Sequence, residues 1–375
     1  MANIYLDYNA STPVDRRVVQ AMHPLLTSAF GNPSSKHWAG IASKAALERA
    51  RSQVAASIGA EPDEIVFTSG GSEANNLALK GTFFATGAAG DHIITQVTEH
   101  PAILRPLAFL ERLGAQVTRL PVDSHGRVDP DAVRRAITPR TRLITIMHAN
   151  NETGTIQPVA EIGEIARAHG IRLHTDAAQS IGKIPVDVNE LGVDLLSIAG
   201  HKFHAPKGIG ALYVRRGVEL EPLIHGAGHE GGRRAGTESA LMAAGLGEAS
   251  ALAHDLTPMA RVCVLRDRLW NALTDRFGDR VALNGDPEHL LPNTLNVSFV
   301  GLVGADVLNR LDGVAASTGS ACHSGRVELS PVLAAMGVSE HAGMGAVRFS
   351  LGRETTPEEI EAVIEKLDQI RALDT

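Results

Sequence analysis

Cysteine is scarce in this chain, with only Cys263 and Cys322 among 375 residues. Two cysteines cannot build a disulfide framework, and this scarcity predicts a reducing compartment, the cytoplasm. The N-terminus lacks the basic segment followed by an apolar one that marks a secretory signal. No apolar stretch approaches the length that spans a membrane. We therefore expect neither export nor membrane association.

Basic runs are also missing, and the formal net charge is −7. A chain without a basic patch is a poor partner for nucleic acid, so none is expected. Hydrophobic residues make up 44% and charged residues 21%, which is ordinary for a globular protein. At 375 residues the chain is too long for one small core, and we expect about two domains.

Strand-like and helix-like segments alternate over residues 15–255. This alternation predicts an α/β domain with a mainly parallel sheet and helices on both faces. The strand-like segments that end in polar clusters cover residues 64–68, 92–97, 142–147, 171–175 and 195–199. Ligands bind beyond the carboxyl ends of strands in such sheets. The sequence therefore predicts a site where these clusters meet.

The pattern changes after about residue 255. A long helix over residues 258–277 leads to strands at 295–299 and near 346–353. A last helix has Thr356 as its cap, Pro357 at its first position and Glu359 two residues on. We expect a second, smaller α+β domain formed by residues 1–14 and 256–375. In the first domain, Ser34 or Ser35 is expected to cap the helix that follows.

A glycine turn, residues 69–72 (SGGS), stands between a strand and a helix. The free amides and positive end of a helix N-terminus favour a phosphate there. No P-loop lysine follows, so a nucleoside triphosphate is not implied. The alternative is an ordinary glycine turn.

Lys202 comes just after an apolar strand, and Asp176 closes the preceding one. A lysine in that position can have a lowered pKa and act as an amine nucleophile. Alternatively, Lys202 is a surface residue in a loop, and Asp176 is a helix cap or the partner of a buried cation. Pyridoxal phosphate (PLP) requires three such features on neighbouring strands. The lysine forms the Schiff base, the aspartate pairs with the ring nitrogen, and the phosphate cup holds the anion.

Two histidine-containing features and the two cysteines also carry predictions. His100 at a strand end is either structural or lies over a cofactor ring. Cys263 lies in an apolar helical stretch and is expected in a core, whereas Cys322 lies among small polar residues, where its thiol is either available for chemistry or incidental. Glycines interrupt the group of His225, His229 and Glu230, so no metal site is expected.

Ordered motifs run along nearly the whole chain. They are residues 5–13 (YLDYNASTP), 31–35 (GNPSS), 67–76 (FTSGGSEANN), 98–101 (TEHP), 149–154 (ANNETG), 174–179 (HTDAAQ), 200–202 (GHK), 234–237 (RAGT), 319–322 (GSAC) and 348–353 (RFSLGR). Through this set the chain resembles the cysteine desulfurases of the NifS/IscS type. These belong to the class V aminotransferase family of fold-type I PLP-dependent transferases. The resemblance implies conversion of L-cysteine to L-alanine, with the sulfur passed on for iron–sulfur cluster assembly or thiolation.

The resemblance also implies roles around PLP. Lys202 would carry the cofactor and move the substrate Cα proton, with His100 stacked on the ring and assisting. Asp176 would pair with the ring nitrogen, and Gln179 would contact the ring hydroxyl. The implied phosphate ligands are Gly71, Ser72, His201 and, from the second subunit of a homodimer, Thr237.

For the substrate, the resemblance implies that Asn151 and Arg348 bind the carboxylate of L-cysteine. Cys322 would take the sulfur as a persulfide and deliver it to an acceptor protein, such as an iron–sulfur scaffold. The chain departs from the family pattern at Ala199, where a serine usually contacts the phosphate, at Gly231, where an arginine is common, and at Ala205, where a glycine is common.

His323 after the cysteine also departs from the usual pattern, and selenocysteine lyases share it. A selenocysteine lyase or a PLP-dependent C–S lyase that releases sulfide is therefore an alternative. A non-catalytic homologue that serves as a scaffold is a remote one.

Overall fold

The computed structural model describes residues 3–86, 91–318, 320–323 and 326–368. Its largest element is a seven-stranded sheet in the order β2-β8-β7-β6-β5-β3-β4. The strands are β2 (Ile65–Thr68), β3 (His92–Gln96), β4 (Gln116–Leu120), β5 (Thr141–Thr145), β6 (Arg172–Asp176), β7 (Leu195–Ala199) and β8 (Gly210–Val214). Only β8 runs antiparallel to its neighbours. The predicted α/β fold with a mainly parallel sheet is confirmed.

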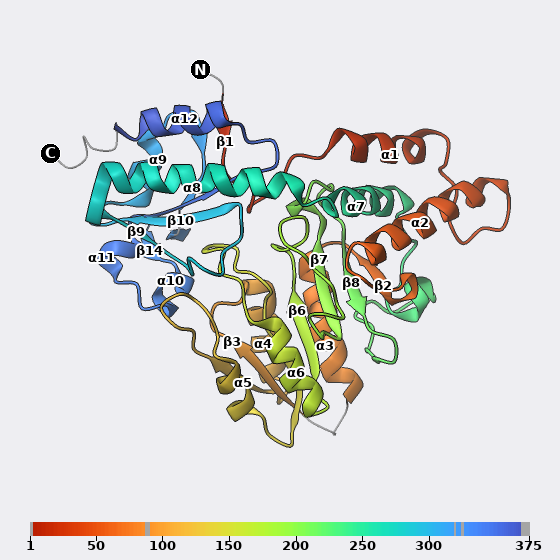
Figure 1. Cartoon of the computed structure of the whole chain (residues 1–375). Helices are drawn as coiled ribbons and strands as arrows, with labels where there is room; N and C mark the ends of the chain where they lie inside the picture. The colour runs from red at the N-terminus through yellow and green to blue at the C-terminus, as the bar shows by residue number, and fades with distance from the viewer. Residues whose placement is uncertain (1–2, 87–90, 319, 324–325, 369–375) are drawn as a thin grey trace.

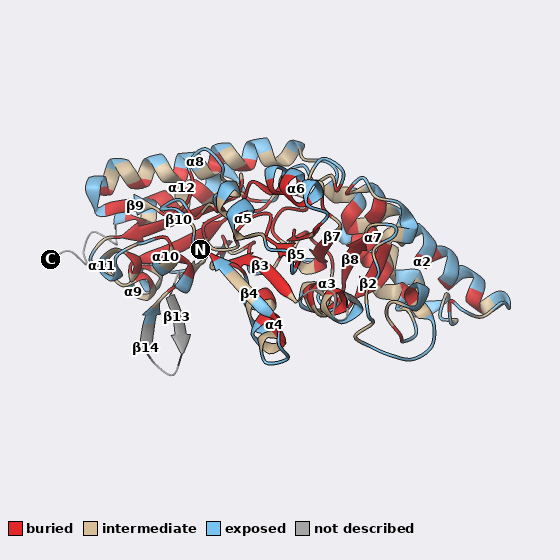
Figure 2. Cartoon of the chain, turned by 90° about the horizontal axis from the view of Figure 1, so that it is seen from below, coloured by how far each residue is buried: buried red, intermediate tan, exposed pale blue. Residues whose placement is uncertain are grey.

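Helices cover both faces of this sheet (Figure 1). Its helices are α1 (Arg16–Thr27), α2 (Trp38–Ala56), α3 (Gly71–Thr86), α4 (Pro101–Glu111), α5 (Pro130–Ala136), α6 (Val159–Ala168) and α7 (Ala240–Ala253). One apolar core contains α3 and α4, and a second contains α2, α5, α6 and α7. Apart from the edge strand β4, the strands between them are almost wholly buried (Figure 2), as expected for a sheet covered on both sides.

A second, four-stranded antiparallel sheet has the order β12-β15-β10-β9. Its strands are β9 (Val281–Leu283), β10 (Thr294–Phe299), β12 (Ser317–Thr318) and β15 (Ala346–Ser350). The helices of this part are α8 (Thr257–Phe277), α9 (Gly304–Arg310), α10 (Pro331–Ala335), α11 (Glu340–Gly343) and α12 (Pro357–Lys366). The core under α8 and α12 includes Ile4 and Leu6 from the N-terminus.

The N-terminal segment joins the two parts. Strand β1 (Ile4–Tyr5) pairs in parallel with β11 (Val314–Ala315), and Asp7 forms a bridge with Ser350. The chain then crosses to the large sheet, where Thr12 N donates to His201 O at 2.9 Å. The division into residues 15–255 and residues 1–14 with 256–375 stays a prediction, because the N-terminal segment contacts both parts.

Two helix starts test the local predictions. The capping box of α12 is confirmed, because Thr356 and Glu359 exchange the two expected bonds. The predicted cap at Ser34 or Ser35 is wrong, because α2 begins later, after His37, and has no side-chain cap. The Asn32 side chain accepts from Ser34 N at 2.9 Å instead, which makes these residues part of a turn. Among the described residues, no helix combines the length and apolar character needed to cross a membrane.

Candidate active site

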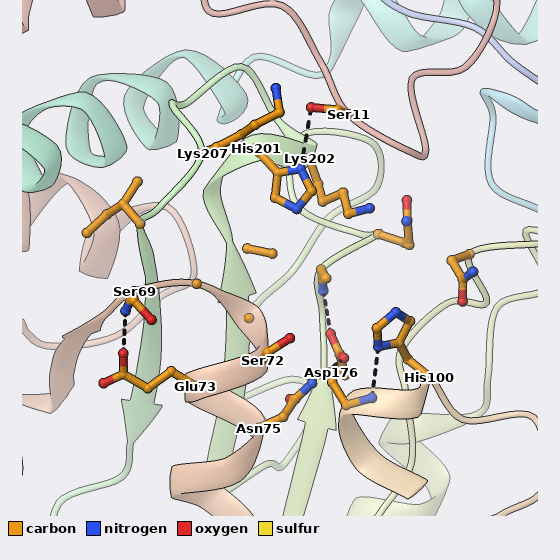
Figure 3. Close-up of a pocket in the computed structure, with 18 of the residues that line it drawn as sticks. Ser11, Ser69, Ser72, Glu73, Asn75, His100, Asp176, His201, Lys202 and Lys207 are labelled. Carbon is orange, nitrogen blue, oxygen red and sulfur yellow. Dashed lines mark hydrogen bonds between the residues drawn. The ribbon is translucent and has the colours of Figure 1, made fainter. Parts of the chain in front are cut away.

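A cavity of about 540 Å³ lies beyond the carboxyl ends of the large sheet's strands. Predicted site residues that line it are Gly71, Ser72, His100, Asn151, Asp176, Gln179, His201 and Lys202. His201 and Lys202 reach in from one side, and Ser72, His100 and Asp176 from the other (Figure 3). The strand-end clusters therefore meet as the sequence predicts.

The predicted phosphate cup lies where β2 turns into α3. Gly70 has a φ of +151°, which favours glycine, and a Cβ at Gly71 would come 3.0 Å from the Cβ of Ala199. Helix α3 starts at Gly71, so its first N–H groups have no partner within the helix. Ala199, the position where the family pattern usually has a serine, packs against this same turn.

Glu73 supports this turn, and the sequence reasoning overlooked it. Its carboxylate accepts from Ser69 N at 2.7 Å and from Arg234 Nε at 2.9 Å. Burial raises the pKa of Glu73, but the bonds from Arg234 and Ser69 outweigh burial, and the net pKa is lowered. The charged Glu73 therefore fixes the loop that opens α3.

Asp176 is buried at the end of β6. Its carboxylate accepts from Asn75 Nδ2 at 2.7 Å and from Ala178 N at 2.9 Å. Both donors are neutral, so they orient the carboxylate and leave its negative charge available for a cation in the cavity. Asn75 was not singled out from the sequence, although it lies within the quoted motif at residues 67–76.

His100 is the N-cap of α4, and its Nδ1 accepts from Ala102 N at 3.1 Å. Burial lowers the pKa of His100, Asp176 opposes this effect, and Lys202 adds to it. A neutral ring whose Nδ1 is an acceptor carries its proton on Nε2. His100 is therefore held as a neutral imidazole at the wall of the cavity.

Lys202 ends a short 3₁₀ turn, Gly200–Lys202, that follows β7. Its Nζ donates to Asn9 O at 2.7 Å and to Ala10 O at 3.0 Å. Burial and then Arg348 lower the pKa of Lys202 to about 8, against the raising effects of Asp176 and Asp7. The amine thus becomes a nucleophile at a pH far below that of a solvated lysine.

Arg348 reaches this region from β15 of the small sheet. Its guanidinium donates to Asn151 O at 2.8 Å and to Asp7 Oδ1 at 2.7 Å. It lies behind the Asn151 backbone and does not itself line the cavity. Asn151, in the turn that follows β5, and Arg348, in β15 of the small sheet, are thus in contact.

Thr237 lies apart from the cavity in a separate pocket of about 100 Å³, which it shares with Ser69 and Arg234. In the same pocket, Glu230 accepts from both Arg51 guanidinium nitrogens at 2.8 Å and from Phe67 N at 2.9 Å. Glu230 and Gly231 have φ of +51° and +65°. The glycine that departs from the family pattern therefore occupies a left-handed position that suits glycine.

Cys322 lies in β13 (Ser320–His323), which pairs with β14 (Arg326–Leu329), placing Cys322 opposite Val327. The side chains of Cys322 and His323 lie outside the described residues. Just beyond the hairpin, Ser330 Oγ donates to Glu152 Oε2 at 2.5 Å. Glu152 follows Asn151, so the base of the hairpin is tied to the wall of the cavity.

Comparison with known protein families shows which proteins this chain is similar to. Residues 4–363 match the family described as aminotransferase class-V. The chain is 48% identical over 371 residues to cysteine desulfurase IscS of Dictyoglomus turgidum, covering 98% of this chain and 94% of that protein. IscS of Methanosarcina thermophila is also 48% identical, with 98% and 91% covered.

Solved structures agree. A NifS-like protein superposes with a TM-score of 0.92 at 37% identity, over 99% of this chain and all of that one. A structure of SspA in complex with cysteine gives a TM-score of 0.84 at 39% identity, over 94% of this chain and all of that one. The predicted fold-type I architecture is thereby confirmed.

Proposed function

Because this chain belongs to the class-V aminotransferase family, we propose that it is a cysteine desulfurase that converts L-cysteine to L-alanine and retains the sulfur. One observation carries the proposal. A lysine with a lowered pKa, a buried carboxylate held by neutral donors and a helix N-terminus converge on one cavity. A desulfurase needs these groups together, and the named relatives support that reaction.

The cavity fits PLP. Its open glycine turn at the start of α3 suits a phosphate, with Gly71, Ser72 and His201 beside it. Asp176 would pair with the protonated ring nitrogen, and His100 would stack on one face of the ring. Gln179 lines the same cavity. When bound, PLP supplies an electron sink that stabilises the charge left by loss of the Cα proton.

The protein's own groups then divide the work. Lys202 holds the cofactor and afterwards takes the Cα proton, since an amine with a pKa near 8 is poised for proton transfer near neutral pH. Neutral His100 offers Nε2–H from the cavity wall. Asn151, with Arg348 behind it, orients the substrate carboxylate.

Sulfur transfer falls to Cys322. Its thiolate attacks the substrate sulfur, an S–S bond forms and the C–S bond breaks. The bonding electrons stay on the substrate Cβ, which takes up the proton that the Cys322 thiol released, and the fragment leaves as alanine. The persulfide on Cys322 then passes its outer sulfur to an acceptor protein, and splitting the reaction at this covalent step makes both halves easier. We place the reaction in the cytoplasm, because a free thiol requires a reducing environment.

A homodimer is part of the proposal. Large apolar side chains are exposed along α1, the following loop and α2, with Trp38 at 77% and Phe30 at 71%. The others are Val19, Leu26 and Ile41. A cluster of this kind marks a protein interface. Thr237, outside the cavity of its own subunit, is then free to serve the partner's phosphate site.

Selenocysteine lyase is a second candidate, favoured by His323 directly after Cys322. In either a selenocysteine lyase or a C–S lyase without a thiol step, Cys322 carries no sulfur. The remote alternative, a scaffold without catalysis, would need no lysine poised beside a buried carboxylate.

Mass spectrometry after incubation with L-cysteine and PLP tests the proposal. Added sulfur on the Cys322 peptide, with alanine released in parallel, is the expected result. Alanine or pyruvate without added sulfur would favour a lyase, and neither product would favour the scaffold. Repeating the assay with L-selenocysteine separates the two substrates.

A further inference from the structure

A second lysine, Lys183, lies buried behind the wall of the cavity. It follows Gln179 by four residues in the turn after β6 and is only 7% exposed. Its Nζ donates to Gln179 Oε1 at 2.7 Å and to Asn9 Oδ1 at 3.1 Å. Both acceptors are neutral amides. A lysine buried against neutral oxygens destabilises the fold, so its presence calls for a functional reason.

The charged groups that act on Lys183 are Lys202 and Arg348, and both are cations. Burial, followed by these two cations, lowers the pKa of Lys183 well below its ordinary value. The structure shows two neutral acceptors for its N–H groups, and no carboxylate among the described residues pairs with it. Lys183 therefore acts as a hydrogen-bond donor to both amides.

The bond from Lys183 determines how the Gln179 amide is turned. With Oε1 facing the lysine, Nε2 must face the other way, and it donates to Asn9 O at 3.1 Å. An amide nitrogen has two hydrogens, and the second is left for the cavity that Gln179 lines. In the flipped orientation Nε2 would face the lysine, and the cavity would meet an acceptor instead.

Asn9 completes this arrangement from the N-terminal segment. It is 1% exposed, and its side chain is fixed by Asn293 Nδ2 at 3.0 Å and Thr294 Oγ1 at 2.9 Å. Its carbonyl accepts from both Gln179 and Lys202. The orientation of Gln179 is thus set by groups from three separate stretches of the chain.

We propose that Lys183 is a positioning residue that keeps the donor side of the Gln179 amide turned toward the ring oxygen of the cofactor. The inference rests on the proposed function, since it assigns Gln179 to that oxygen. A donor there stabilises the negative oxygen and weakens its hold on the proton that it shares with the Lys202 nitrogen. Loss of the donor strengthens that hold.

The test uses the purified holoenzyme and the visible absorption of bound PLP, which changes as this proton is lost. Lys183→Met should raise the midpoint pH of the change by about one unit, as expected for one charge-assisted hydrogen bond. Gln179→Leu should raise it equally, and the double variant no further, because the lysine acts through the glutamine. Lys80→Met, which removes a lysine stacked on Phe109, is the matched control.

An unchanged midpoint in Lys183→Met, or shifts that add in the double variant, would overturn the inference. If Lys183→Met does not fold, Lys183→Ser carries the same expectation, since a small polar side chain leaves space for water but cannot reach Gln179. The outcomes also separate the two proposals. A wild-type protein that binds no PLP or forms no alanine refutes the proposed function, whereas an active wild type with an unshifted variant refutes only the role of Lys183.

Discussion

The two sheets meet at the cavity but contribute to it in different ways. The large sheet ends in a polar pocket, where Asp176 and His100 are held by bonds within residues 15–255 and Lys202 donates to Asn9 of the N-terminal segment. The small part offers Arg348, which lies in its four-stranded sheet and acts through Asn151, and the separate hairpin that carries Cys322. The difference teaches that cofactor chemistry and sulfur capture are built on separate frameworks. Each can therefore be damaged alone.

Replacing Lys202 should have the largest effect, because it removes the group that holds the cofactor and moves the proton. Lys202→Ala should lower alanine formation by roughly 10³-fold or more. Lys44→Ala, at an exposed position of α2, is the control. Activity within tenfold of wild type would show that the large sheet does not supply the amine.

Cys322→Ser should stop sulfur capture but should leave the reaction of L-cysteine with the cofactor, which depends on the large sheet, unchanged. Addition of L-cysteine should still change the cofactor absorption, but no persulfide should form on the protein. Cys263→Ser, in α8, should behave as wild type in mass spectrometry. Sustained alanine turnover in Cys322→Ser would mean that the two frameworks are not divided as proposed.

Arg348→Gln should weaken both frameworks, because the side chain bridges them. The KM for L-cysteine should rise about 10- to 100-fold, the size expected for a lost charged hydrogen bond. Arg310→Gln, elsewhere in the same part, should leave KM unchanged.

The same variant has a pH signature. Only the neutral amine of Lys202 attacks PLP, so the rate of PLP capture by the apoprotein should increase as the pH rises through the pKa of about 8. Removing the positive charge of Arg348 raises this pKa, and the midpoint should move upward. It should stay below that of a solvated lysine, since burial is the larger cause. A midpoint that moves downward would contradict this account.

Asn75→Ala should weaken PLP binding about tenfold, because Asp176 loses one of its two donors. Asn76→Ala is a close control, since Asn76 donates to Ser72 O on the exposed side of α3. Equal losses in the two variants would show that the effect belongs to the helix and not to Asp176.

Thr356→Ala should have the smallest effect, and that effect should be limited to the stability of the small part. Loss of the cap of α12 should lower the free energy of unfolding by about 1 kcal/mol, measured in urea. The affinity for PLP should not change. A weaker affinity would indicate that the small part helps to hold the cofactor.

The sequence predicted the features that depend on residues close together in the chain. The strands, the clusters at their ends and the capping box follow from periodicity and from residues a few positions apart. It did not identify Asn75 or Lys183, because their importance comes from the partner they meet. Asn75 lies 101 residues from Asp176, and Asn9 lies 170 from Gln179. The cap at Ser34 or Ser35 failed because a turn at Asn32 competed for the same backbone groups.

The crossing of the N-terminal segment also constrains the order of assembly during synthesis. Strand β1 emerges first, yet its partner, Val314–Ala315, is made more than three hundred residues later. Asn9, whose carbonyl accepts from Lys202, donates its own N–H to Ser350 Oγ, 341 residues away. The large sheet can form on the ribosome, but its cavity stays unfinished until nearly the whole chain has emerged.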